Sequence, residues 1–144
     1  MKTIKHNTAG CFLTRKNGEK LELLLIHRKW PEGDEGWLPP KGHIETDESF
    51  KEAAVRETTE ETGYKNLSIV RFLKTVKYQY DWPKGKTHDK TTHWFLAKLN
   101  DETMVEKVLD QWEKDTTVEQ KWFDISEAKK VMRFDNDREI LDLI

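Results

Sequence analysis

The first part of the chain alternates between short apolar runs and stretches rich in turn residues. Apolar runs at residues 9–14 and 21–28 are separated by the turn sequence KNGE at 16–19, which predicts two strands joined as a β-hairpin. Residues 29–43 follow with several glycines and prolines, which favour an irregular loop over a helix or a strand.

A helix is predicted next because signals for both of its ends are present. Ser49 and Glu52 have the spacing of a capping box, and Gly63 is a residue type that commonly follows a helix C-terminus. We therefore expect the helix to begin at Ser49 and to end just before Gly63.

The later elements are predicted from shorter patterns, and together they indicate a mixed α/β fold. Strands interrupted by one central helix and closed by terminal helices predict the α/β class, in a single domain over residues 1–144. We expect strands at 67–80 (one strand or two), 92–99 and 121–125, a polar loop at 81–90, a helix or a loop at 101–120, and helices at 126–132 and 137–144.

Composition narrows the class of protein without identifying a function. The chain is 36% charged and 35% hydrophobic, and with six Trp it is too aromatic for a disordered chain. Its net charge of −2 gives no global attraction to nucleic acid or to an anionic membrane. The single cysteine, Cys11, cannot form an internal disulfide. Because no apolar run approaches the ~20 residues of a membrane span and the N-terminus has no signal-like stretch, we predict a cytoplasmic location.

The predicted helix carries carboxylates where its apolar stripe should continue. At about 100° per residue, Phe50, Ala53 and Ala54 share one side, and Glu57 and Glu61 fall on that same side with Glu60 at its flank. One interpretation is a solvated face in which Arg56 bridges Glu52 and Glu60. Carboxylates that continue an inward stripe fit a hard divalent cation better, because Mg²⁺ and Mn²⁺ take oxygen ligands.

These residues resemble the signature of the Nudix hydrolases. The match runs from Gly42 through Glu48, Arg56-Glu57 and Glu60-Glu61 to Gly63 at the family's spacing, while Thr58 and Tyr64 replace its usual aliphatic residues. The resemblance implies an α/β/α sandwich around a mixed β-sheet. It also implies hydrolysis of nucleoside diphosphates linked to another moiety, with Mg²⁺ as the cofactor and Mn²⁺ as a possible substitute.

The resemblance assigns roles to the residues of this signature, which we call the box. Glu57, Glu60, Glu61 and the carbonyl of Gly42 would hold metal, Arg56 would orient the glutamates, and Glu48 would support the metal shell. Glu60 would act as the general base, with Glu57 as the reserve choice. Many members add an acidic residue from a later loop, and here Asp115 and Glu119 are the candidates, against a plain solvated loop.

The flanking segments resemble the dinucleoside polyphosphate hydrolases within this superfamily. That similarity rests on GWLPPKGHIE, HDKTTHWFLA and RFDNDREILDLI. It implies a small-molecule nucleotide substrate such as diadenosine tetra- to hexaphosphate. Lys41, His43 and Lys90 would bind the polyphosphate, and Tyr78 and Tyr80 would stack on adenine, with core packing as the alternative for the tyrosines.

Other functions stay open at this level. A diphosphoinositol polyphosphate or another nucleoside-diphosphate-X pyrophosphohydrolase is the enzymatic alternative, and an RNA 5′-end or modified-nucleotide hydrolase is a weaker one. A non-catalytic nucleotide sensor should have lost metal glutamates, whereas this chain keeps them all. We expect no membrane and no stable nucleic-acid partner, and either a monomer or a homodimer.

Overall fold

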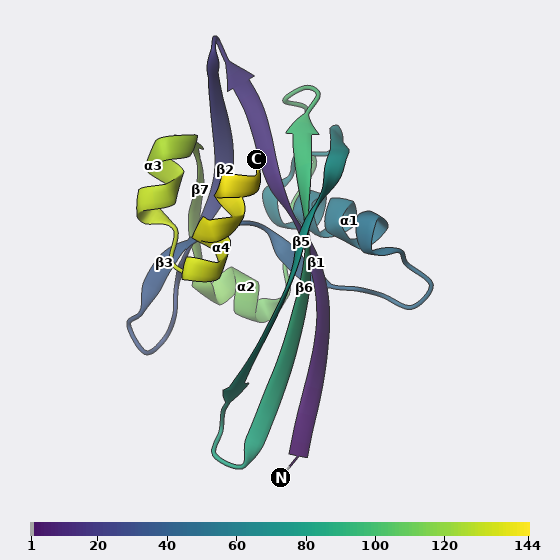
Figure 1. The fold of residues 1–144 in the computed structure, drawn as a ribbon, viewed down its shortest axis with the longest axis vertical. Coiled ribbons are helices and arrows are strands. Elements are labelled where there is room, and N and C mark those ends of the chain that lie inside the picture. The colour runs from purple at the N-terminus through teal and green to yellow at the C-terminus, as the bar shows by residue number, and fades with distance from the viewer. Residues whose placement is uncertain (1) are drawn as a thin grey trace.

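The computed structural model describes residues 2–144 and forms a mixed β-sheet between helices (Figure 1). The sheet order is β3-β2-β1-β6-β5, with β4 paired to β1 and β7 paired to β2. The β1–β6 pair is parallel and the other pairs are antiparallel, which confirms the predicted mixed sheet. The strands are β1 (Lys2–Asn17), β2 (Lys20–Lys29), β3 (Glu35–Leu38), β4 (Lys41–His43), β5 (Leu67–Asp81), β6 (Lys86–Leu99) and β7 (Thr117–Asp124).

Helices cover both faces of the sheet and divide the core into two clusters. On one face, Cys11 of β1 packs with Ala53 and Ala54 of α1. On the other, Phe12 of β1 packs with Met132 beside α3 and with Ile140 of α4. Successive strand residues point to opposite faces, so one strand serves both clusters. The helices are α1 (Phe50–Thr62), α2 (Gln111–Thr116), α3 (Ile125–Val131), α4 (Asp135–Ile140) and the 3₁₀-helix η1 (Leu141–Leu143).

Helix α1 forms as its end signals predict. The Glu52 amide donates to Ser49 Oγ at 3.1 Å, and the Ser49 amide donates to Glu52 Oε1 at 3.1 Å, which completes the capping box. Gly63 ends the helix with φ 85°, a left-handed conformation that glycine adopts without penalty. Phe50 is less buried than its stripe suggests, because it is 45% exposed and stacks on the His93 ring.

The structure corrects several predicted loops. The loop expected at 81–90 is confined to residues 82–85, and residues 29–43 contain both β3 and β4. Residues 101–120, expected to form a helix or a loop, do contain a helix, α2, and in addition the start of β7. Strand β4 and the start of β6 pair with β1, and the start of β7 pairs with β2. These ladder partners are distant in sequence, and local composition carries no record of the pairing.

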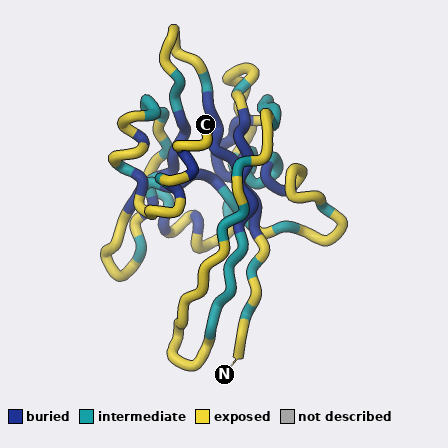
Figure 2. Tube along the Cα trace, viewed as in Figure 1, coloured by how far each residue is buried: buried dark blue, intermediate teal, exposed yellow. Residues whose placement is uncertain are grey.

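The longest strands extend beyond the helices as an arm, formed by residues 2–8 of β1, 74–81 of β5 and 86–93 of β6 (Figure 1). Most of the arm is exposed or half-exposed (Figure 2). His6 of β1 lies opposite Lys90 of β6, which lies opposite Tyr78 of β5, so one face of the arm carries all three side chains. None of the helices in residues 2–144 is long and apolar enough to cross a membrane.

Candidate active site

Strand β4 lies against helix α1, and each of its residues contacts the glutamate-rich face. The Lys41 amide donates to Glu61 Oε2 at 3.3 Å, and the His43 carbonyl accepts from Arg56 Nη2 at 2.9 Å. Between them, Gly42 packs so closely that a β-carbon built on it would lie 2.0 Å from the Glu57 carboxyl carbon. The backbone of β4 therefore faces the glutamates, and Lys41 and His43 share one side of the strand.

Arg56 holds the outer carboxylates of the box. Its Nε and Nη2 donate to the two oxygens of Glu48 at 2.7 and 3.0 Å, and its Nη1 donates to Glu57 at 2.8 Å and to Glu60 at 3.1 Å. The hydrogen bonds from Arg56 hold the pKa of Glu48 below its usual value. Burial raises the pKa of Glu57 in spite of Arg56. Arg56 contacts Glu60 but not Glu52, whose side chain caps the helix.

Glu61 is the most buried carboxylate of the box, with 4% of its surface exposed. Burial first, and then a hydrogen bond with the Glu113 carboxyl, raise the pKa of Glu61 well above its usual value. The buried guanidinium of Arg28 lies 3.7 Å from Glu61 and 3.8 Å from Glu113. The inward placement predicted for Glu61 is thus confirmed, and Arg28 supplies the buried positive charge beside it.

The additional acidic residue beside the box is Glu113, which our sequence reasoning missed. Asp115 is exposed and accepts a hydrogen bond from Gln111, and Glu119 is exposed on β7; neither contacts a box glutamate within residues 2–144. The signal in the sequence was the capping box of α2, in which Asp110 and Glu113 cap each other's amides. No comparable pattern in the sequence pointed to Arg28.

The oxygen donors of this cluster fit a hard divalent cation. Four glutamates, 57, 60, 61 and 113, converge at the junction of β4, α1 and α2, and Gly42 leaves its backbone in contact with Glu57. Within residues 2–144 no three acidic, His or Cys side chains already surround one point, because the carboxylates turn toward Arg56 and Arg28. Carboxylate and carbonyl oxygens are the ligands that Mg²⁺ and Mn²⁺ prefer.

Lys41 is the cation nearest to this cluster on the opposite side of β4. Its ammonium lies 5.9 Å from the centre of the Tyr78 ring and 6.0 Å from that of Trp94. Burial lowers the pKa of Lys41, while the charges of Asp137 and Glu61 oppose that shift. Asp137 belongs to α4, so the C-terminal helix delivers a carboxylate to the candidate site, which sequence reasoning also missed.

The burial of Asp137 leads to a prediction about stability. Burial raises the pKa of Asp137 from 3.8 to about 6, so the folded protein holds a proton there between these values and the unfolded chain does not. Ionised Asp137 therefore destabilises the fold above pH 6. We expect Asp137→Asn to increase the free energy of unfolding at pH 7.5 by at most about 3 kcal/mol, and the gain to vanish as the pH falls from about 6 to about 4.

Urea unfolding of the wild type and the variant across this pH range measures the difference. Asp142→Asn is the matched control, because Asp142 is largely exposed and pairs with Lys129 at 2.8 Å near the same end of the chain. Equal or lower stability of Asp137→Asn at pH 7.5 would contradict the prediction.

The remaining predicted substrate-binding residues lie on the arm. Tyr78 and Tyr80 share a face, with ring centres 6.4 Å apart, and are 37% and 39% exposed. The Lys90 ammonium lies 5.8 Å from the centre of the Tyr80 ring, and burial lowers the pKa of Lys90. A groove of about 530 Å³ opens along the arm; its lining includes His6, Tyr78 and Lys90.

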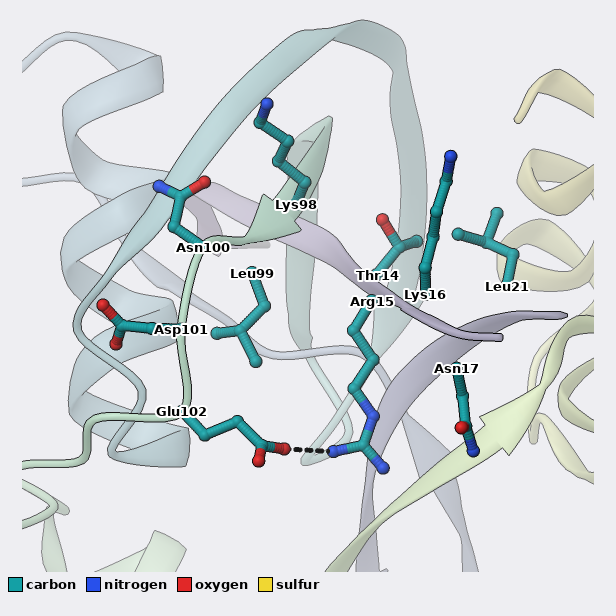
Figure 3. A pocket seen from close by; sticks show the side chains of 10 residues that line it. All are labelled: Thr14, Arg15, Lys16, Asn17, Leu21, Lys98, Leu99, Asn100, Asp101 and Glu102. Carbon is teal, nitrogen blue, oxygen red and sulfur yellow. Dashed lines mark hydrogen bonds and ion pairs between the residues drawn. The ribbon is translucent and has the colours of Figure 1, made fainter. Parts of the chain in front are cut away.

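A larger cavity, of about 780 Å³, lies elsewhere, between the β1–β2 hairpin and the end of β6 (Figure 3). None of the candidate residues lines it. Arg15 there donates to Glu102 at 2.6 Å and to Glu22 at 2.9 Å, so its charge is already matched. This cavity has no chemical connection with the glutamate cluster.

Comparisons with known proteins find similar sequences and a similar fold. The NUDIX domain family matches residues 4–144. An asymmetrical bis(5′-nucleosyl)-tetraphosphatase of Caenorhabditis elegans is 30% identical over 125 residues, covering 85% of this chain and 82% of its own. An RNA pyrophosphohydrolase of Sulfurovum sp. (strain NBC37-1) is 32% identical over 111 residues, covering 72% and 68%. The crystal structure of a C. elegans Ap4A hydrolase binary complex superimposes with a TM-score of 0.71 at 27% identity, covering 95% and 93%.

Proposed function

This chain belongs to the NUDIX domain family, and we propose that it hydrolyses dinucleoside polyphosphates such as diadenosine tetraphosphate. Family membership confirms the predicted Nudix fold and the predicted enzyme class, a pyrophosphohydrolase that acts on acid anhydrides of phosphorus. The substrate is the part that we propose.

One observation carries the choice of substrate. Beside the glutamate cluster, the face of β4 and the arm presents Lys41 next to the Tyr78 ring and Lys90 next to the Tyr80 ring. Cations spaced beyond the reacting phosphate suit a long polyphosphate, and half-exposed aromatic rings suit a nucleobase. The similarity to the nematode tetraphosphatase along most of both chains supports this choice.

Mg²⁺ is the cofactor that we propose, with Mn²⁺ as a substitute. Glu57, Glu61 and the Gly42 carbonyl would hold the ion, with Glu113 completing the oxygen shell. When bound, a divalent cation neutralises polyphosphate charge and lowers the pKa of a coordinated water. Glu61 would give up the proton that burial now favours on it.

Glu60 is the general base in this proposal. Its side chain is 31% exposed, against 14% for Glu57 and 3% for Glu61, so it is the box carboxylate most open to an incoming water. A single hydrogen bond from Arg56, at 3.1 Å, orients it. Glu60 would take a proton from the attacking water while Lys41 and Lys90 hold the phosphates, releasing ATP and AMP.

The test is product analysis by ion-exchange chromatography with diadenosine tetraphosphate, run with Mg²⁺ and with EDTA. We expect ATP and AMP only with the metal. Repeating the reaction in ¹⁸O-labelled water identifies the phosphorus that is attacked, because the label enters only the product formed there.

Parallel incubations separate the alternatives. A 5′-triphosphorylated RNA tests the activity named for the Sulfurovum relative, and a diphosphoinositol polyphosphate tests the remaining enzymatic alternative. Turnover of either without cleavage of diadenosine tetraphosphate would overturn the proposed substrate and leave the glutamate chemistry intact. Binding without turnover of any of them would favour a nucleotide sensor.

A further inference from the structure

Three histidine side chains from three strands form a hydrogen-bonded chain that ends beside the glutamate cluster. Nε2 of His43 lies 3.2 Å from Nδ1 of His6, and Nε2 of His6 lies 2.8 Å from Nδ1 of His88. Nε2 of His88 lies 2.6 Å from the carbonyl oxygen of Trp82, at the tip of the arm. Strands β4, β1 and β6 are thus linked through their side chains in addition to their backbones.

The carbonyl at the far end fixes the position of each proton in a chain of neutral rings. A carbonyl only accepts, so His88 must carry its proton on Nε2 and leave Nδ1 as an acceptor. Nε2 of His6 must then donate to His88, which leaves Nδ1 of His6 to accept from Nε2 of His43. By elimination, the open nitrogen is Nδ1 of His43, which has no hydrogen-bond partner within residues 2–144.

Ring stacking restrains the chain along its length. The hydrogen-bonded His6 and His88 rings are nearly parallel, with centres 5.1 Å apart, and the Tyr80 ring stacks on His88 with centres 4.7 Å apart. Burial, followed by the charge of Lys90, lowers the pKa values of His6 and His43. The hydrogen-bond geometry of the three rings carries the tautomer assignment.

We propose that His6 and His88 are positioning residues that hold His43 in its Nε2–H tautomer, so that Nδ1 of His43 faces the bound substrate as a hydrogen-bond acceptor. The group that it meets is then a donor, such as a hydroxyl group or a water, and not a phosphate oxygen. This inference rests on the proposed function in one respect only, that substrate binds on the face shared by Lys41 and His43.

The hydrogen bonds themselves are tested by NMR on ¹⁵N-labelled protein at about pH 8, well above the ordinary histidine pKa of about 6.5. The chain contains five histidines, so single substitutions can assign every imidazole signal. We expect nitrogen–nitrogen couplings across the hydrogen bonds from Nε2 of His6 to Nδ1 of His88 and from Nε2 of His43 to Nδ1 of His6. Couplings in the opposite direction, or none, would overturn the proposal whatever the substrate.

Kinetics with diadenosine tetraphosphate distinguish positioning of His43 by His6 from a purely structural role of His6 in holding the strands of the arm together. Replacing His6 by phenylalanine keeps a ring but removes both hydrogen bonds, and we expect KM to rise about threefold to tenfold with kcat changed less than about twofold. His6→Gln retains one donor and one acceptor and should restore KM to within about twofold. If neither variant changes KM, or if both change it equally, His6 does not position His43.

His27→Phe is the control for a histidine substitution as such. His27 stacks on Trp37 outside the chain, with ring centres 4.8 Å apart, and a phenylalanine can keep that contact. We expect its KM to match the wild type. If the wild type fails to cleave diadenosine tetraphosphate, the proposed substrate falls, and the NMR couplings still decide the tautomer.

Discussion

Glu60→Gln is expected to lower kcat for diadenosine tetraphosphate by about a hundredfold to ten-thousandfold, the range that a general base contributes. The amide keeps the size of the side chain and can still accept from Arg56, so the fold should persist. What it loses is the ability to take a proton from water. Initial rates at saturating Mg²⁺ and substrate, with circular dichroism as the check on folding, measure the effect.

Two comparisons make the assignment specific. Glu52→Gln changes the charge on the same helix but retains the capping box, which accepts Glu or Gln, so its activity should equal that of the wild type. Glu57→Gln tests the reserve assignment. A kcat close to normal for Glu60→Gln, together with a collapse for Glu57→Gln, would transfer the role of base to Glu57.

The features that the sequence predicted correctly are those encoded by nearby residues. Helix α1 could be placed from Ser49, Glu52 and Gly63 because capping involves residues a few positions apart. The inward position of Glu61 follows from the helical period, since it lies on the side of Ala53 and Ala54, which are fully buried. Local rules thus brought the box glutamates together without knowledge of the rest of the fold.

The features that were missed depend on contacts between distant segments. Arg28 and Glu113 meet because β7 pairs with β2 and brings the preceding α2 against α1. The arm was predicted partly as a loop, because its polar residues form strands through the pairing of β6 with β5 on one side and with the distant β1 on the other. His6 and His88 illustrate the same limit. They are far apart in the chain, yet Nε2 of His6 lies 2.8 Å from Nδ1 of His88. Nothing in a local window encodes such pairs.

Gly42→Ala is expected to have the second large effect, a loss of at least about a hundredfold in kcat, because a misplacement of about 1 Å near the chemistry can cost that much. The added β-carbon would lie 2.0 Å from both the carboxyl carbon and an oxygen of Glu57, so the carboxylate must move. Overpacking should also lower the free energy of unfolding by about 1–3 kcal/mol. Activity assays and urea unfolding measure the two effects.

The expected loss in Gly42→Ala comes from crowding of the new β-carbon against Glu57, and not from backbone strain. Two further variants test this distinction. Gly18 has φ 67°, and apart from its two chain neighbours no residue of 2–144 has an atom within 4 Å of a built β-carbon. Gly18→Ala should therefore lose stability through its left-handed backbone while keeping kcat. Adding Glu57→Asp to Gly42→Ala withdraws the carboxylate by one methylene and should recover stability without recovering activity. Wild-type kcat in Gly42→Ala would mean that Glu57 can leave β4 without harm, and the proposed ligand set of Glu57 and the Gly42 carbonyl would then be wrong.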